Sequence, residues 1–149
     1  MGSEELIRGS VCRLVKISPS FPPGSKAPRV GDFIPSTRER EDAEKRGVAA
    51  LLSVFDEERT TLGEAKNIYG SANECIGFGL SVEGVRNIRT PKTGRGLRVL
   101  RDPLPAEMAD LPGASGHSGI EGLHRPPGAP KDDFKYLRLK LVDLAEFRG

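Results

Sequence analysis

The sequence has no tryptophan, only 5% aromatic residues and no apolar run long enough to span a bilayer. The shortage of aromatic side chains removes the stacking surface on which many proteins bind single-stranded nucleic acid. A transmembrane helix would need about 20 apolar residues in a row, and the opening stretch MGSEELIRGS lacks the apolar segment of a secretory signal. We therefore expect no membrane partner and a cytoplasmic location.

Cysteine and histidine are equally scarce, with two residues of each type. Cys12 and Cys75 are too few and too far apart for a disulfide framework, so we expect two reduced thiols. Together with His117 and His124 they include the residue types of a tetrahedral zinc site, but the paired spacings of such sites do not occur. The sequence therefore predicts no metal.

Glycine and proline, in contrast, are abundant, with 18 and 12 residues in a chain of 149. This length is sufficient to bury a core, and the glycines and prolines interrupt the periodic segments. We expect a single loop-rich α+β domain over residues 1–149, with a small mixed or antiparallel sheet, short helices and a C-terminal helix. Residues 1–9 are expected to be a disordered leader, 18–47 a loop and a solvated helix, and 125–131 a proline-rich linker.

Five segments have strand character, either as a continuous apolar run or as an alternation of apolar and polar residues. The most continuous run, VAALLSVF at residues 48–55, has the length of a buried strand and is expected at the centre of the sheet. Gly77 and Gly79 interrupt the segment 75–82, which indicates a bulge or the close approach of another backbone or a ligand. The other three expected strands are residues 10–17, 97–100 and 120–123.

Two capping boxes mark the starts of helices. Ser36 with Glu39 opens a segment that Gly47 would end, and Thr61 with Glu64 opens a second, shorter helix that Gly70 would end. The first segment, TREREDAEKR, is charged all round, which favours a solvated helix or a disordered segment over a binding surface.

Two further helices are expected later in the chain. Residues 82–88 fit a single short turn of helix. The C-terminal segment is expected to begin at a cap formed by Asp132 or Asp133, and Phe134, Leu137, Leu141, Leu144 and Ala145 follow at helical spacing. A C-terminal helix packed on the sheet is therefore predicted.

Basic residues are concentrated between Glu83 and Asp102, where no acidic residue intervenes. A run of this kind can attract an anionic ligand or nucleic acid, and a turn that carries Lys92 and Arg95 can meet a phosphate. A solvated basic loop is the alternative interpretation. The candidate anion-binding residues are Arg86, Arg89, Lys92, Arg95, Arg98 and Arg101.

The glycine and serine motifs are incomplete. Val82 stands where the third glycine of a dinucleotide-binding G-x-G-x-x-G would follow Gly77 and Gly79. GHSGI resembles the G-x-S-x-G nucleophile elbow, but Ile120 replaces its last glycine, which disfavours a serine hydrolase built on Ser118. His117, between small residues, suits an acid–base or ligand-orienting role, and a histidine bonded to backbone is the alternative.

Several short motifs follow one another along the chain, namely PRVGDFIPS, LLSVFDEERTT, GFGLSVEGVRNI, LRVLRDPLP and GHSGIEG. In this order they resemble small, poorly characterised bacterial proteins in which R-P-S-x-x-F precedes L-S-V and D-P-L-P precedes A-H-x-x-[IV]-x-G. The resemblance implies a compact α+β domain of the bacterial cytosol and a role for His117. The matching residues are Arg29, Phe33, Ser36, Leu52, Ser53, Val54, Asp102, Pro103, Leu104, Pro105, His117 and Gly122.

Three functions fit these observations. The first is an accessory domain of a bacterial conflict, toxin–antitoxin or defence system that binds another protein and needs no cofactor. The second is a small nucleotide-handling enzyme that cleaves NAD or transfers ADP-ribose, with His117, Arg13 and Ser36 as candidate catalytic residues. The third is nucleic-acid binding through residues 86–101, which would weaken steeply with salt.

Overall fold

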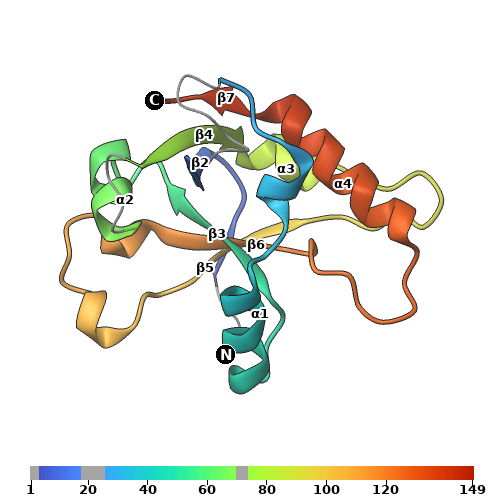
Figure 1. The fold of residues 1–149 in the computed structure, drawn as a ribbon, viewed down its shortest axis with the longest axis horizontal. Coiled ribbons are helices and arrows are strands. Elements are labelled where there is room, and N and C mark those ends of the chain that lie inside the picture. Colours follow the sequence, from blue (N-terminus) through green and yellow to red (C-terminus); the bar gives the residue numbers. More distant parts are fainter. Residues whose placement is uncertain (1–3, 18–25, 70–73) are drawn as a thin grey trace.

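One antiparallel sheet organises the chain in the computed structural model, which describes residues 4–17, 26–69 and 74–149. Its seven strands lie in the order β1-β5-β6-β3-β2-β4-β7 (Figure 1), which confirms the expected α+β fold. The strands are β1 (Glu5–Leu6), β2 (Ser10–Lys16), β3 (Leu51–Asp56), β4 (Cys75–Ser81), β5 (Arg98–Arg101), β6 (His117–Glu121) and β7 (Glu146–Phe147). The helices are α1 (Thr37–Arg46), α2 (Leu62–Tyr69), α3 (Val82–Asn87) and α4 (Lys131–Leu144), with short 3-10 helices η1 (Val30–Phe33), η2 (Ala106–Met108) and η3 (Ala114–Gly116).

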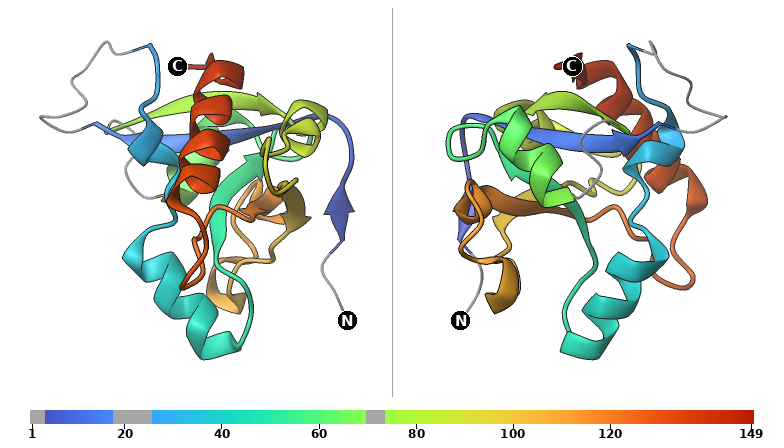
Figure 2. Two further views of the ribbon diagram at one scale, coloured as in Figure 1. Left: turned by 90° about the vertical axis from the view of Figure 1, so that its right-hand side faces the viewer. Right: turned by 60° about the vertical axis from the view of Figure 1, so that its left-hand side comes forward.

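The sheet opens between two of its central strands. β2 pairs with β4 along its whole length, but it pairs with β3 only at Val11–Asp56 and Cys12–Phe55. Beyond these pairs the two strands diverge, and Figure 2 shows β2 and β4 running across the molecule while β3 turns away from them. β3 therefore stays paired with β6 but has no partner strand on the side toward β2 over its first residues.

Side chains of the sheet pack into two main apolar clusters, one on each face. On one face, Leu52 and Val54 of β3 are completely buried with Leu137 and Leu141 of α4. On the other face, Phe55 packs in a cluster with α2 and the loop between β5 and β6. Because side chains alternate along a strand, the polar Ser53 projects from the same face as Phe55, away from α4.

Most predicted strands are confirmed, and β3 lies at the centre of the sheet as expected, although it begins at Leu51, three residues after the predicted start. The fifth predicted strand, residues 120–123, differs from the structure: β6 begins at His117, three residues before the expected start. The apolar pattern does not indicate this start because the first buried residues of the strand, Ser118 and Gly119, are not apolar. A Cβ on Gly119 would lie 2.6 Å from the Cβ of Leu51, so a glycine is needed where β6 packs against β3.

Both predicted capping boxes are confirmed. Ser36 Oγ accepts the Glu39 amide at 3.1 Å and Thr61 Oγ1 accepts the Glu64 amide at 3.1 Å, and each glutamate carboxylate accepts the backbone N–H of the capping residue. Gly47 ends α1 with a φ of 67°. β4 runs in an uninterrupted register with β2, so a bulge is absent, and the other alternative, close approach of another backbone, is met at Gly77, whose carbonyl accepts the Arg148 amide at 2.8 Å.

The predicted cap of the C-terminal helix is wrong. Pro130 occupies the capping position of α4, and no side chain caps the helix. Asp133 instead accepts hydrogen bonds from Thr93 Oγ1 at 2.6 Å and from Arg95 Nε at 3.2 Å. A carboxylate in the first turn favours the helix electrostatically without capping it, and here it also ties α4 to a distant loop.

Several expected loops carry structure. Glu5–Leu6, within the expected leader, pair with β5, and Phe33 is fully buried within the loop that precedes α1. The start of that loop (18–25), the first three residues and the predicted helix end at Gly70 lie outside the described residues. Within the described part of the chain, no helix combines the length and apolar character needed to cross a bilayer.

Candidate active site

A cleft of about 680 Å³ lies on the face of β3 and β6 that is opposite α4. Helix α1 contributes charged side chains to its wall, and α2 and the segment after β5 contribute mainly apolar ones. Ser53 and His117 lie on its floor, on neighbouring strands of the sheet.

The Ser53 hydroxyl and the His117 ring are in direct contact. Ser53 Oγ lies 2.7 Å from His117 Nε2, and His117 Nδ1 lies 2.6 Å from the backbone oxygen of Asp102. A carbonyl oxygen only accepts hydrogen bonds, so Nδ1 carries the proton of the neutral ring and Nε2 accepts the proton of Ser53. The edge-to-face contact with Phe55, with ring centroids 5.2 Å apart, also holds the imidazole in this orientation.

A carboxylate lies beside the same ring nitrogen. Asp102 Oδ2 is 3.7 Å from His117 Nδ1, and Asp102 Oδ1 is 3.8 Å from Arg46 Nη1. Arg46 also pairs with Asp42 at 2.8 Å. The Asp102 carboxylate therefore lies next to a ring whose side chain is only 11% exposed.

The backbone of Ser53 is held by two side chains where β2 and β3 diverge. Its N–H donates to Glu39 Oε2 at 2.6 Å, and its C=O accepts from Arg13 Nη1 at 3.0 Å. Arg13 Nε also donates to the backbone oxygen of Asp32 at 3.1 Å. These bonds replace those that a partner strand would have made, and they fix the position of the serine.

Arg13 and Glu39 form a charged support beneath the serine. Burial lowers the pKa of the Arg13 guanidinium, whereas the neighbouring groups Glu39, Tyr69 and Asp32 raise it. Arginine nevertheless keeps its proton in proteins, so the guanidinium remains a cation that the Glu39 charge stabilises. The support therefore combines charge with directed hydrogen bonds to both backbone groups of Ser53.

The three predicted catalytic residues lie close in the fold but play different parts. Only His117 lines the cleft. Arg13 contacts the backbone of Ser53, and Ser36 shares the Glu39 carboxylate with Ser53, so both are joined to the site through bonds behind it. Sequence reasoning from residue types missed Ser53, Asp102 and Glu39.

A signal for each missed residue was nevertheless present in the sequence. Ser53 and Asp102 belong to the short L-S-V and D-P-L-P motifs of the resemblance, and Glu39 belongs to the first capping box. The predicted solvated face of α1 also lines the cleft, through Arg38, Glu39 and Arg46.

The basic run 86–101 is largely neutralised by acidic residues from elsewhere in the chain. Arg89 donates to the backbone oxygens of Arg86 and Ile88, and Lys92 is exposed. The other four members form ion pairs: Arg86 with Glu5 at 3.1 Å, Arg95 with Asp133 at 3.2 Å, Arg98 with Glu121 at 2.9 Å and Arg101 with Asp56 at 2.7 Å. Most side chains of the run therefore make contacts within the fold rather than forming a free basic surface.

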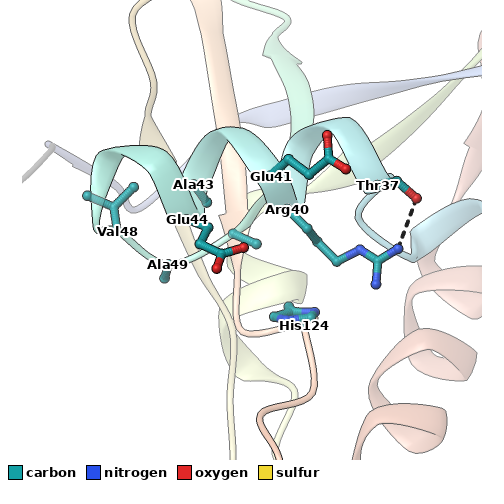
Figure 3. Close-up of a pocket in the computed structure, with 9 residues that line it drawn as sticks. Thr37, Arg40, Glu41, Ala43, Glu44, Val48, Ala49 and His124 are labelled. Carbon is teal, nitrogen blue, oxygen red and sulfur yellow. Dashed lines mark hydrogen bonds between the residues drawn. The ribbon is translucent and has the colours of Figure 1, made fainter.

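The remaining candidate nucleophiles and ligands lie away from this floor. Ser118 is buried and donates to the Gly116 carbonyl at 3.0 Å. Cys12 and Cys75 are free thiols, and burial raises the pKa of each, for Cys12 to about 12. His124 lines a separate hollow of about 480 Å³ on another face of α1 (Figure 3).

The Ser53 hydroxyl is hydrogen-bonded to His117, whose other ring nitrogen is oriented by a carbonyl and lies beside a carboxylate. Such an arrangement activates serine for nucleophilic attack. Within the described residues, no group of three histidine, cysteine or acidic side chains is placed to hold a metal ion.

The chain matches no protein-family model, no curated protein and no solved structure.

Proposed function

We propose that the cleft is the active site of a hydrolase that cleaves an ester or amide through Ser53 and His117. The observation that carries this proposal is the 2.7 Å contact between Ser53 Oγ and His117 Nε2 at the floor of the cleft. The tautomer set by the Asp102 carbonyl supports it, because it leaves Nε2 free to accept the serine proton.

The reaction uses Ser53 as nucleophile and His117 as base. Ser53 Oγ bonds to the carbonyl carbon while its proton passes to His117 Nε2; the bond to the leaving group then breaks, and the leaving group takes that proton. Water next attacks the acyl carbon and gives a proton to Nε2, the bond from Ser53 Oγ breaks, and the proton returns to the serine. Asp102 stabilises the imidazolium that forms in each half of the reaction.

The developing oxyanion needs a positive partner, and Arg38 is the candidate. It lines the cleft and is exposed, and no other described residue forms an ion pair or hydrogen bond with its guanidinium. Arg46, in comparison, is already engaged by Asp42 and Asp102. A guanidinium that is free in the resting site can stabilise charge as it appears on the substrate oxygen.

The proposal is tested with a fluorophosphonate probe, which labels activated serines, and with p-nitrophenyl acetate. We expect labelling of the protein and ester hydrolysis, both lost in Ser53→Ala. His117→Ala should lower kcat by about 10²–10⁴-fold, the usual contribution of a general base. Ser115→Ala is the matched control, because Ser115 is an exposed serine near His117. Hydrolysis or labelling that persists in Ser53→Ala would refute the proposal.

Protein binding, the first function expected from the sequence, is the second candidate. Tyr69 is 45% exposed and lines the cleft, and exposed aromatic side chains often anchor protein partners. Under this alternative, Tyr69→Ala weakens capture of a partner from the source cells, whereas Ser53→Ala leaves it unchanged.

The dinucleotide hypothesis receives less support from the site. The Arg13 side chain donates to the backbone of Ser53, and the Ser36 hydroxyl accepts the Glu39 amide, so both side chains are engaged away from a phosphate beside His117. Incubation with NAD and measurement of released nicotinamide remains the test of that function.

A further inference from the structure

The cleft has two chemically different ends, with Ser53 between them. At one end the backbone of Ser53 is bound by Glu39 of α1, whose neighbours Arg38, Asp42 and Arg46 also line the cleft. At the other end lies Phe55, two residues further along the same face of β3. Figure 1 shows α1 and α2 at opposite ends of β3, which matches this division.

The end beyond Phe55 is apolar. Phe55 and Ile68 are 4% and 7% exposed and belong to one buried cluster, against which Leu104 and Met108 pack while remaining partly exposed. All four side chains line the cleft. An apolar wall that remains open to solvent gains free energy when an apolar group of a ligand covers it.

We infer that the substrate carries an apolar acyl chain, which lies against Phe55, Ile68, Leu104 and Met108, and a polar leaving group, which faces α1. This inference rests on the proposed function, since it assumes that Ser53 attacks the carbonyl between these two parts. Its physical basis is the placement of the serine, with the apolar cluster around Phe55 on one side and the charged side chains of α1, together with Leu51, on the other.

The charged end fits a polar leaving group for a second reason. The guanidinium of Arg46 is held by two carboxylates, and Arg38 reaches the cleft without an ion pair to any described residue. An apolar chain placed there would remove water from these charges without replacing its hydrogen bonds, which is unfavourable. The polar end therefore excludes the acyl chain and gives the substrate one orientation.

Two p-nitrophenyl esters, the acetate and the hexanoate, test the inference on the full-length protein. Each methylene that is buried should raise kcat/KM by about fourfold, so we expect the hexanoate to be preferred by at least about tenfold. Met108→Glu should reduce this preference to near unity by placing a charge in the chain site. Met108→Ala, which disturbs the fold less, should reduce it several-fold, and Glu107→Ala on the same exposed turn is the matched control.

The outcomes separate the inference from the function on which it rests. Equal kcat/KM values for the two esters, both abolished by Ser53→Ala, would overturn the acyl-chain inference and support the hydrolase. An unchanged hexanoate preference in both Met108 variants would also overturn the inference. Hydrolysis of both esters that survives in Ser53→Ala would overturn the hydrolase, and the acyl-chain inference with it.

Discussion

At the scale of single residues, the site depends on one carboxylate that performs two tasks. Glu39 Oε1 accepts the Ser36 amide at 2.8 Å, which caps α1, and Glu39 Oε2 accepts the Ser53 amide at 2.6 Å. Each oxygen therefore satisfies one backbone donor. The same side chain starts a helix and positions the proposed nucleophile.

Replacement of Glu39 by glutamine should separate these tasks. Glutamine has one acceptor oxygen, so it can complete the capping box or accept the Ser53 amide, but not both. We expect Glu39→Gln to lower the free energy of unfolding by about 1–3 kcal/mol, the cost of one buried donor left unsatisfied. Urea unfolding measures this, with the exposed Glu41→Gln as control, which should change stability by less than about 0.5 kcal/mol. Equal losses in the two variants would contradict the assignment.

Cys12 makes stability depend on alkaline pH. Burial, followed by the charge of Glu57, raises its pKa from the ordinary 9.0 to about 12, so the folded protein holds this proton where the unfolded chain loses it. The contribution of Cys12 is complete below pH 9.0 and is lost as pH rises toward 12, with a slope of about 1.4 kcal/mol per pH unit. Urea unfolding between about pH 8 and about pH 11 should show this slope in the wild type relative to Cys12→Ala. Parallel pH profiles would contradict it.

At the scale of elements, β5 carries two arginines that look alike in the sequence and differ in the fold. Arg98 pairs with Glu121 at the surface, where its side chain is 55% exposed, whereas Arg101 pairs with Asp56 with both side chains mostly buried, at 15% and 7%. The basic run is therefore not a uniform surface. The environment of each arginine is set by the acidic residue with which it pairs in the fold.

The two arginines should respond very differently to substitution. Arg101→Ala leaves the Asp56 carboxylate buried without its cation and should lower the free energy of unfolding by about 3–5 kcal/mol. Arg98→Ala removes an exposed pair and should lower it by at most about 1 kcal/mol. Thermal or urea unfolding of both variants measures the difference. Similar losses in both would show that burial does not separate these pairs.

The helices and most strands could be predicted from the sequence because their signals are local. The capping boxes at Ser36 and Thr61 and the apolar run of β3 lie within short windows, and the structure confirms them. The start of β6 was not predicted because burial there falls on Ser118 and Gly119, which have no apolar periodicity.

At the scale of the whole molecule, the site is a product of long-range pairing. Ser53 and His117 are separated by 64 residues and meet because β3 pairs with β6. The small residues around His117 mark it as a candidate functional residue, but the local sequence does not indicate which strand lies beside it. Local patterns define each strand, whereas the site depends on which strands become neighbours.

The divergence of β2 and β3 also has a consequence for how this chain can be stabilised. Continued pairing of the two strands past Cys12 would replace the bonds from Arg13 and Glu39 with a regular backbone ladder, and it would be favourable only if both side chains were replaced, because each would otherwise lose its partner on Ser53. It would also remove the support that fixes Ser53 in the cleft. Selection for thermostability without selection for the proposed activity would therefore have to change Arg13 and Glu39 together to close this gap.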